Sequence, residues 1–211
     1  MARGVAASGV RLFGVASSTR DSDGGAPAEC GFVRTRDLAA LVKPVSDARR
    51  ELDPSEIDLH QRIIENAFER GGVLPAPCGT VFRSTEQLRG WMEQNYLALS
   101  EGLQFVAGRC EARVHLSRRP TKESEPPQTA QPAGITECFR ALRRVSAAAM
   151  TLPPATAPEP ALFSAAFLLE RERWSDFETA VHALAQRHGA LVIRQTGPWP
   201  PYDFVRLDFG I

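Results

Sequence analysis

The sequence predicts an α+β fold divided into two domains, because strand-like and helix-like runs alternate along the whole chain. Three stretches carry helix-start signals followed by apolar residues at helical spacing, and they begin at Asp53, Ser84 and Ser175. Between them lie short runs that alternate apolar and polar residues or are continuously apolar, as strands do. The order of these elements fits a split β-α-β, ferredoxin-like arrangement in both halves.

Length, charge and cysteine content are those of an ordinary globular protein. The chain has 211 residues, a formal net charge of +0 and 43% hydrophobic residues. A neutral chain lacks the general basic surface of polyanion-binding proteins, and neutrality favours association with other proteins. The four cysteines are too widely spaced for a zinc site, so we expect reduced thiols at Cys30, Cys78, Cys110 and Cys138.

We expect a cytoplasmic protein that does not span a membrane. The first ten residues lack the sustained apolar core of a secretory signal peptide. The most apolar stretch, residues 161–169, is far shorter than the roughly 18 residues that a membrane helix needs.

The first half reads as three strands, two helices and an extended segment between the helices. Asp53 and Glu56 can form a capping box, with Pro54 at the first helical position, and Ser84 can cap the second helix. The predicted elements are strands at 10–16, 30–33 and 38–45, a helix at 53–70, the extended segment 73–82 and a helix at 84–106.

The second half reads as β-α-β-α-β with two proline-rich connectors. Its predicted elements are strands at 110–117, 162–169 and 190–196, helices at 135–150 and 176–188, and connectors at 118–134 and 151–160. Apolar residues alternate again from Val205 to Phe209, which predicts a short edge strand. We place the domain boundary after Gly108, with an N-terminal domain at 1–108 and a C-terminal domain at 109–211.

The stretch 196–205 is the most distinctive part of the chain. It holds three prolines, one glycine and three aromatic residues directly after a strand. Each proline fixes φ at about −65° and removes a donor, so we expect a stiff, extended segment that cannot complete a sheet ladder. In a polyproline II helix Trp199 and Tyr202 would share one face. Whether these aromatics fill a core or form a docking ridge for a partner is left open by the residues.

Six stretches in the same order resemble the gas vesicle accessory proteins of the GvpF/GvpL family. The stretch 196–205 resembles the C-terminal motif of that family, and residues 73–82 resemble its Val-Leu-Pro-Leu-Arg-Phe-Gly-Thr-Val-Phe segment. Four shorter stretches complete the resemblance: Arg-Leu-Phe-Gly-Val from Arg11, Asp-Leu-Ala-Ala-Leu-Val from Asp37, His-Gln-Arg-Ile-Ile from His60 and Gly-Arg-Cys-Glu from Gly108.

This chain departs from the family pattern at three positions within those stretches. Gln61 stands where the family has a glutamate, and Pro77 and Cys78 stand where it has an arginine and a phenylalanine. A function that needs that glutamate or arginine is therefore not carried over. The fold that the resemblance implies is unaffected.

The resemblance implies an N-terminal α+β domain, a C-terminal ferredoxin-like domain and a role in gas vesicle assembly. The expected partners are the small hydrophobic shell protein (GvpA-like), which the chain would chaperone or nucleate into the shell, and other gas vesicle accessory proteins. The expected location is the cytoplasm, at the gas vesicle. The residues expected to bind the partner or to support the fold are Trp199, Pro200, Pro201, Tyr202, Phe204, Leu74, Phe82 and His60.

The residues indicate no catalytic, cofactor or metal site. His60 lies on the apolar stripe of its helix, where burial is expected, and its neighbour Gln61 offers no acid. No nucleotide-binding or nucleophile motif is present. A basic helix edge without aromatic RNA-binding strands argues against nucleic acid. We predict a protein that is not an enzyme; the alternative is a small-ligand-binding or enzymatic ferredoxin-like protein.

Overall fold

The chain folds into two separate α+β units, which we describe one at a time. The computed structural model describes residues 9–18, 30–46, 52–119, 132–153, 161–207 and 209. Unit 1 comprises Met1–Gly108 and Pro200–Ile211, and unit 2 comprises Arg109–Trp199. The predicted α+β class is confirmed, since each unit combines a sheet with helices. The segment from Pro200 was expected in the C-terminal domain but belongs to unit 1.

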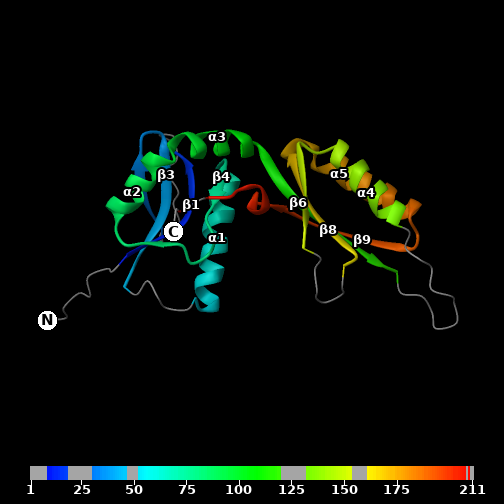
Figure 1. Ribbon diagram of the computed structural model, residues 1–211, viewed down its shortest axis with the longest axis horizontal. Helices are drawn as coiled ribbons and strands as arrows, with labels where there is room; N and C mark the ends of the chain where they lie inside the picture. Colours follow the sequence, from blue (N-terminus) through cyan, green and yellow to red (C-terminus); the bar gives the residue numbers. More distant parts are fainter. Residues whose placement is uncertain are drawn as a thin grey trace. The chain divides into compact units, whose positions relative to one another are not determined.

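Unit 1 is built on a five-stranded antiparallel sheet with the order β2-β3-β1-β4, in which β5 also pairs with β1. Three helices pack against this sheet (Figure 1). The elements of unit 1 are β1 (Gly9–Ser17), β2 (Gly31–Thr35), β3 (Leu38–Val45), α1 (Pro54–Arg70), β4 (Val73–Pro75), β5 (Val81–Phe82), α2 (Thr85–Gln94), α3 (Tyr96–Val106) and the 3-10 turn η3 (Tyr202–Phe204). This order differs from the split β-α-β arrangement that the sequence predicted for the first half.

The helix starts of unit 1 follow from local side chains, as predicted. Asp53 Oδ1 accepts a hydrogen bond from the backbone N–H of Glu56 at 3.0 Å, and the Asp53 N–H donates to Glu56 Oε2 at 3.3 Å. The hydroxyl of Ser84 accepts from the backbone N–H three residues later at 3.2 Å, which caps α2. The predicted helix 84–106 is broken at Asn95, where α2 ends and α3 begins.

The core of unit 1 lies between its sheet and its helices, and β1 supplies its centre. Leu12, Phe13 and Val15 of β1 have no exposed side-chain surface. Val205, Leu207 and Phe209 pack against this core from the C-terminal tail. The alternation of these three residues therefore reflects packing against unit 1, and the predicted edge strand is not formed.

Unit 2 has the element order β-α-β-β-α-β and the strand order β7-β8-β6-β9, which is a ferredoxin-like arrangement. Its sheet is antiparallel throughout. The elements are β6 (Arg109–Arg118), α4 (Pro132–Arg144), β7 (Ala148–Leu152), β8 (Phe163–Glu170), the 3-10 turn η2 (Arg171–Arg173), α5 (Trp174–Arg187) and β9 (Leu191–Trp199). Most of the two predicted connectors, residues 120–131 and 154–160, lie outside the described residues.

Strand β7 corrects the predicted helix 135–150. Helix α4 ends at Arg144, where the Ser146 hydroxyl donates to the carbonyl oxygens of Leu142 at 3.0 Å and Arg143 at 3.1 Å. The chain then pairs with β8 from Ala148 onward. Alanine and methionine favour helices locally, so this strand depends on its pairing with β8.

Both helices of unit 2 lie on one face of its sheet (Figure 1). Aromatic rings join each helix to the sheet. The ring of Phe167 on β8 lies 5.9 Å from that of Phe139 on α4 and 5.4 Å from that of Phe177 on α5, measured between centroids. Side chains alternate along a strand, so the neighbours of Phe167 face the opposite side. That side carries no helix of unit 2 among the described residues.

Candidate functional site

The distinctive stretch 196–205 continues the sheet of unit 2 before it turns into unit 1. Strand β9 extends to Trp199, which lies opposite Glu111 of β6 across a β-bulge. The chain enters unit 1 at Pro200, and Tyr202–Phe204 form a 3-10 turn. The expectation that this segment cannot complete a sheet ladder is therefore wrong, because β9 pairs with β6 up to Trp199. The 3-10 turn at Tyr202 also means that Trp199 and Tyr202 do not share a polyproline II helix. Of the three prolines, Pro198 lies within β9, in the bulge between the pairs Arg113–Thr196 and Glu111–Trp199, while Pro200 and Pro201 follow the end of the strand.

Gly197 has no space for a side chain. Its φ of 124° lies in a region that residues with a Cβ rarely adopt. A Cβ atom here would lie 2.7 Å from the carbonyl oxygen of Glu111 and 2.9 Å from Cη2 of Trp174. Two residues later, Trp199 Nε1 donates a hydrogen bond of 3.1 Å to Thr196 Oγ1. The local path of this stretch thus depends on the close approach of β9 to β6 and α5.

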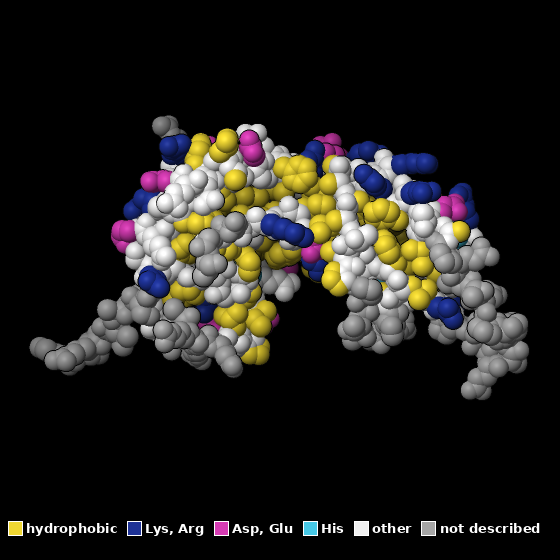
Figure 2. Space-filling view, viewed as in Figure 1, with side chains coloured by type: hydrophobic (Ala, Val, Ile, Leu, Met, Phe, Trp, Pro, Cys, Tyr) yellow, Lys and Arg dark blue, Asp and Glu magenta, His cyan; other side chains and the backbone are white. Residues whose placement is uncertain are grey.

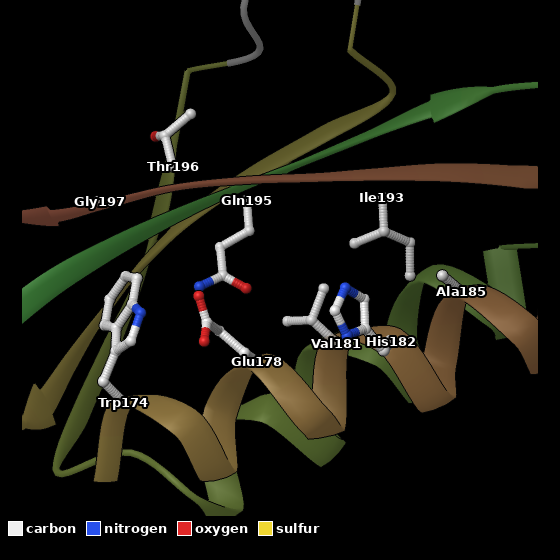
Figure 3. A pocket seen from close by; sticks show the side chains of 9 residues that line it. All are labelled: Trp174, Glu178, Val181, His182, Ala185, Ile193, Gln195, Thr196 and Gly197. Carbon is white, nitrogen blue, oxygen red and sulfur yellow. The ribbon is translucent and has the colours of Figure 1, made fainter. Parts of the chain in front are cut away.

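A groove of about 270 Å³ lies between α5 and β9, directly beside Gly197. Figure 3 shows the Trp174 ring at one end, with the Glu178 carboxylate and the Gln195 amide facing each other. The lining residues are Trp174, Glu178, Val181, His182, Ala185, Ile193, Gln195, Thr196 and Gly197. Such a lining offers apolar contact and hydrogen-bonding groups to a small molecule.

The segment Val73–Phe82 belongs to the core of unit 1. The Leu74 side chain is 2% exposed and packs against Gly102 of α3, where a Cβ would lie 3.2 Å from Leu74 Cδ1. The ring of Phe82 lies 5.6 Å from that of Trp91 and 6.0 Å from that of Phe209, between centroids. Both residues that the sequence singled out here are therefore buried, and neither is exposed to a partner in this structure.

Unit 1 brings the start of this segment together with the C-terminal tail. A second groove of about 270 Å³ is formed there, lined by Pro75, Ala76, Pro77, Tyr202, Val205, Arg206 and Leu207. Of the singled-out residues in the tail, Pro200 and Pro201 are buried, and Tyr202 and Phe204 are half-buried. Two stretches that the sequence marked separately thus meet in one unit.

His60 is a core residue of unit 1. Its side chain is 6% exposed, and its ring centroid lies 5.5 Å from that of Phe13. Burial lowers the pKa of His60, the backbone of Ala76 partly offsets this, and the charge of Arg11 lowers it further. The imidazole is therefore neutral at pH 7. Its neighbour Gln61 is exposed and hydrogen-bonds one turn along the helix.

A buried ion pair near His60 was not predicted from the sequence. Arg11 Nη1 donates to Glu56 Oε1 at 2.9 Å, and the side chain of Arg11 is only 6% exposed. This hydrogen bond is the main cause that lowers the pKa of Glu56. The signal was present, because Arg11 is the charged residue of an otherwise apolar strand, and a buried charge needs a partner.

The described residues contain no cluster of three or more His, Cys, Asp or Glu that could hold a metal ion. All four cysteines are free. Burial raises the pKa of both Cys30 and Cys110 to about 11, so neither is a reactive thiolate. No helix in the described parts of the chain is long and apolar enough to cross a membrane.

Known proteins match the chain along most of its length. The family described as gas vesicle synthesis protein GvpL/GvpF matches residues 9–134 and 127–206. Gas vesicle protein F of Haloferax mediterranei is 26% identical over 199 residues, which are 89% of this chain and 87% of that protein. Gas vesicle protein F2 of Halobacterium salinarum is 25% identical over 181 residues, which are 84% and 81%. The crystal structure of GvpF from Anabaena has a TM-score of 0.76 at 20% identity, covering 95% of this chain and 97% of that one.

Proposed function

We propose, since the chain belongs to the gas vesicle synthesis protein GvpL/GvpF family, that it binds the small hydrophobic shell protein and assists its assembly. The observation that carries the proposal is that the family match spans both units, including the stretch 196–205. A subunit that packs apolar surface in a finished shell exposes that surface before assembly and tends to aggregate. A factor that covers this surface keeps the subunit soluble until it joins or nucleates the shell.

The role that we propose is not enzymatic and is exercised in the cytoplasm, at the growing gas vesicle and beside other accessory proteins. The buried, neutral His60 and the lack of a metal-binding cluster among the described residues support it. The neutral net charge of the chain also favours protein association over binding to a polyanion.

Co-expression with the small shell protein of the same host tests the proposal. The shell protein is expected to stay soluble and to co-purify with the tagged chain. A shell protein that aggregates and never associates, while this chain is folded, would contradict direct binding. An unrelated ferredoxin-like protein of similar size serves as the control.

Trp199 allows the docking and structural roles of the distinctive stretch to be separated. Trp199 is half-buried, and its ring nitrogen donates a hydrogen bond to Thr196. Trp199→Ala therefore removes both an aromatic contact surface and a local hydrogen bond. If the variant loses the shell protein but keeps its melting temperature, Trp199 contacts the partner. If it loses both, Trp199 supports the fold.

The groove between α5 and β9 favours a second candidate function, the binding of a small ligand. Its volume of about 270 Å³ and its facing Glu178 and Gln195 suit a compact polar molecule with an apolar part. Native mass spectrometry of the purified chain tests this. A bound metabolite that is lost in Gln195→Ala would support it, and a ligand-free chain would not.

A further inference from the structure

The strand edges of the two sheets differ in their protection against pairing with a foreign strand. An exposed edge offers unpaired backbone groups, which natural proteins guard with charges, prolines, bulges or brevity. Edge strand β9 carries exposed Arg194, Pro198 and a bulge. Edge strand β2 carries exposed Arg34, whose guanidinium lies 5.3 Å from the ring centroid of Phe32. Edge strand β4 has three residues and ends in a proline.

Strand β7 lacks charges, prolines and bulges, and its length of five residues is its only protection. Its sequence, Ala-Ala-Met-Thr-Leu, holds no charge and no proline, and its register with β8 is continuous. β8 pairs with one of its edges, and no strand among the described residues pairs with the other. Every residue of β7 keeps some exposure, whereas Ser164 to Leu169 of β8 are buried. β7 therefore offers a free edge beside a finished sheet.

The register tells which side chains an added strand would meet. Ala149 lies opposite Phe167, so it shares the face that α4 and α5 cover. Met150 lies opposite Ala166 and Leu152 opposite Ser164, and they share the face without helices. A strand next to β7 would place alternate side chains beside Met150 and Leu152, which favours apolar residues there.

The surroundings of β7 are basic. Helix α4, which leads directly into β7, carries exposed Arg140, Arg143 and Arg144. None of the three forms an ion pair with another described residue. Figure 2 shows Lys and Arg side chains gathered over the helices of unit 2. Arginine and lysine also outnumber carboxylates in residues 109–199. The arginines beside the uncharged edge of β7 would therefore attract a partner in which acidic residues flank an uncharged segment.

We propose that the free edge of β7 pairs with an uncharged extended segment of a partner protein, flanked by acidic residues that face the arginines of α4. Backbone hydrogen bonds supply the affinity, and the apolar face and the arginines supply the selection. A second copy of this chain fits less well, because it would add the same three arginines. The inference rests on the proposed function in taking the partner to be the shell protein.

A peptide titration of the full-length chain tests the edge without the shell protein. The probe is an acetylated, amidated peptide of alternating valine and threonine, five residues long, with two glutamates at each end. N-methylation of every second amide of the peptide removes the N–H groups that would donate hydrogen bonds to β7. We therefore expect the methylated peptide to bind roughly tenfold more weakly, or weaker still. Replacing the glutamates by lysines is expected to weaken binding by about tenfold as well.

Two matched variants place the contact on β7. Met150→Lys with Thr151→Lys adds charge to the free edge, and Ala183→Lys with Gln186→Lys adds the same charge to exposed positions of α5. The first pair is expected to weaken peptide binding by about tenfold, although its lysines attract the acidic probe. The second pair should leave binding within about threefold of wild type. Should the β7 variant not fold, the N-methylated peptide still decides.

The outcomes separate this inference from the proposed function. Equal binding of the N-methylated peptide, or an unchanged affinity of the β7 variant, overturns strand addition. A dimer in analytical ultracentrifugation that the β7 variant dissociates also overturns it, because a second copy then fills the edge. If the β7 variant still co-purifies with the shell protein, the inference fails and the proposed function stands. If the wild-type chain never co-purifies with the shell protein, the proposed function fails, and the peptide titration alone tests strand pairing at β7.

Discussion

The Arg11 guanidinium donates a hydrogen bond of 2.9 Å to the Glu56 carboxylate, which joins the first half of β1 to the first turn of α1. Glu56 also accepts from the backbone of Asp53, so one side chain both caps the helix and neutralises a buried charge. Without Glu56, the guanidinium would lose its counter-charge inside unit 1.

Removing the carboxylate of this pair is expected to cost more stability than replacing the arginine by an apolar side chain. Glu56→Gln leaves Arg11 buried and unneutralised, whereas Arg11→Met removes the charge and keeps an apolar side chain in an apolar strand. We therefore expect Glu56→Gln to lower the melting temperature more than Arg11→Met. Thermal unfolding by circular dichroism checks this, with the double variant as the control. A double variant whose loss equals the sum of the two single losses would show that the pair is not coupled.

The pair also predicts a pH dependence. The hydrogen bond from Arg11 lowers the pKa of Glu56 below its ordinary value of 4.5. A carboxylate whose pKa falls on folding stabilises the fold above its unfolded pKa, and this stabilisation is lost as pH falls through the folded pKa. The difference in melting temperature between wild type and Glu56→Gln should be full near neutral pH and shrink below about pH 4.5. A constant difference across that range would argue against the ion pair.

His60 predicts a second pH dependence, at higher pH. Its pKa is lowered from the ordinary value of 6.5, mainly by burial, so the unfolded state binds the proton more readily. The stability of unit 1 is therefore complete above about pH 6.5 and falls as pH drops through the folded pKa. The free energy of unfolding, measured in urea, should change less steeply with pH in His60→Gln than in wild type. The control is His115→Gln in unit 2, where the pKa of the histidine is also lowered by burial. This change should leave the pH dependence of unit 1 as it is in wild type.

Gly197→Ala is expected to destabilise unit 2 by roughly 1–3 kcal/mol, because its φ is positive and a Cβ meets the Glu111 carbonyl at 2.7 Å. Gly189→Ala is the control in the same unit, since its Cβ would meet nothing within 4 Å. We expect the control to lie within about 0.5 kcal/mol of wild type. Urea midpoints, followed by tryptophan fluorescence, measure both. Equal midpoints for the two variants would contradict the close packing of β9.

The tail residue Phe209 is expected to stabilise unit 1, although it is distant in sequence. Its ring is stacked 5.1 Å from that of Trp91, between centroids. Phe209→Ala should cost about 1–3 kcal/mol and shift the Trp91 emission toward longer wavelength, as water reaches the indole. Leu97→Ala, at a side chain that is 69% exposed, should change stability by less than about 0.5 kcal/mol. An unchanged emission in Phe209→Ala would show that the tail does not pack there in solution.

Local sequence patterns were sufficient for the elements that depend on neighbouring residues. The cap at Asp53 joins groups three residues apart, and the burial of His60 follows from the helical spacing of its neighbours. The start of α5 shows the limit of such patterns. Ser175 reads as a cap, but the helix already begins at Trp174, after a 3-10 turn. The fold class and the family resemblance rest on many such patterns at once, so a single misplaced boundary did not alter them.

Contacts between distant segments settled the rest of the structure. Residues 148–152 carry good helix formers, and they form β7 because β8 offers them a ladder. The tail alternates like a strand, and it packs against unit 1 because Trp91 and Phe82 offer it an aromatic surface. Arg11 is tolerated in β1 because Glu56, 45 residues later in the sequence, accepts its hydrogen bond and balances its charge. A local window contains no partner across such separations, and it is the partner that makes each of these conformations favourable.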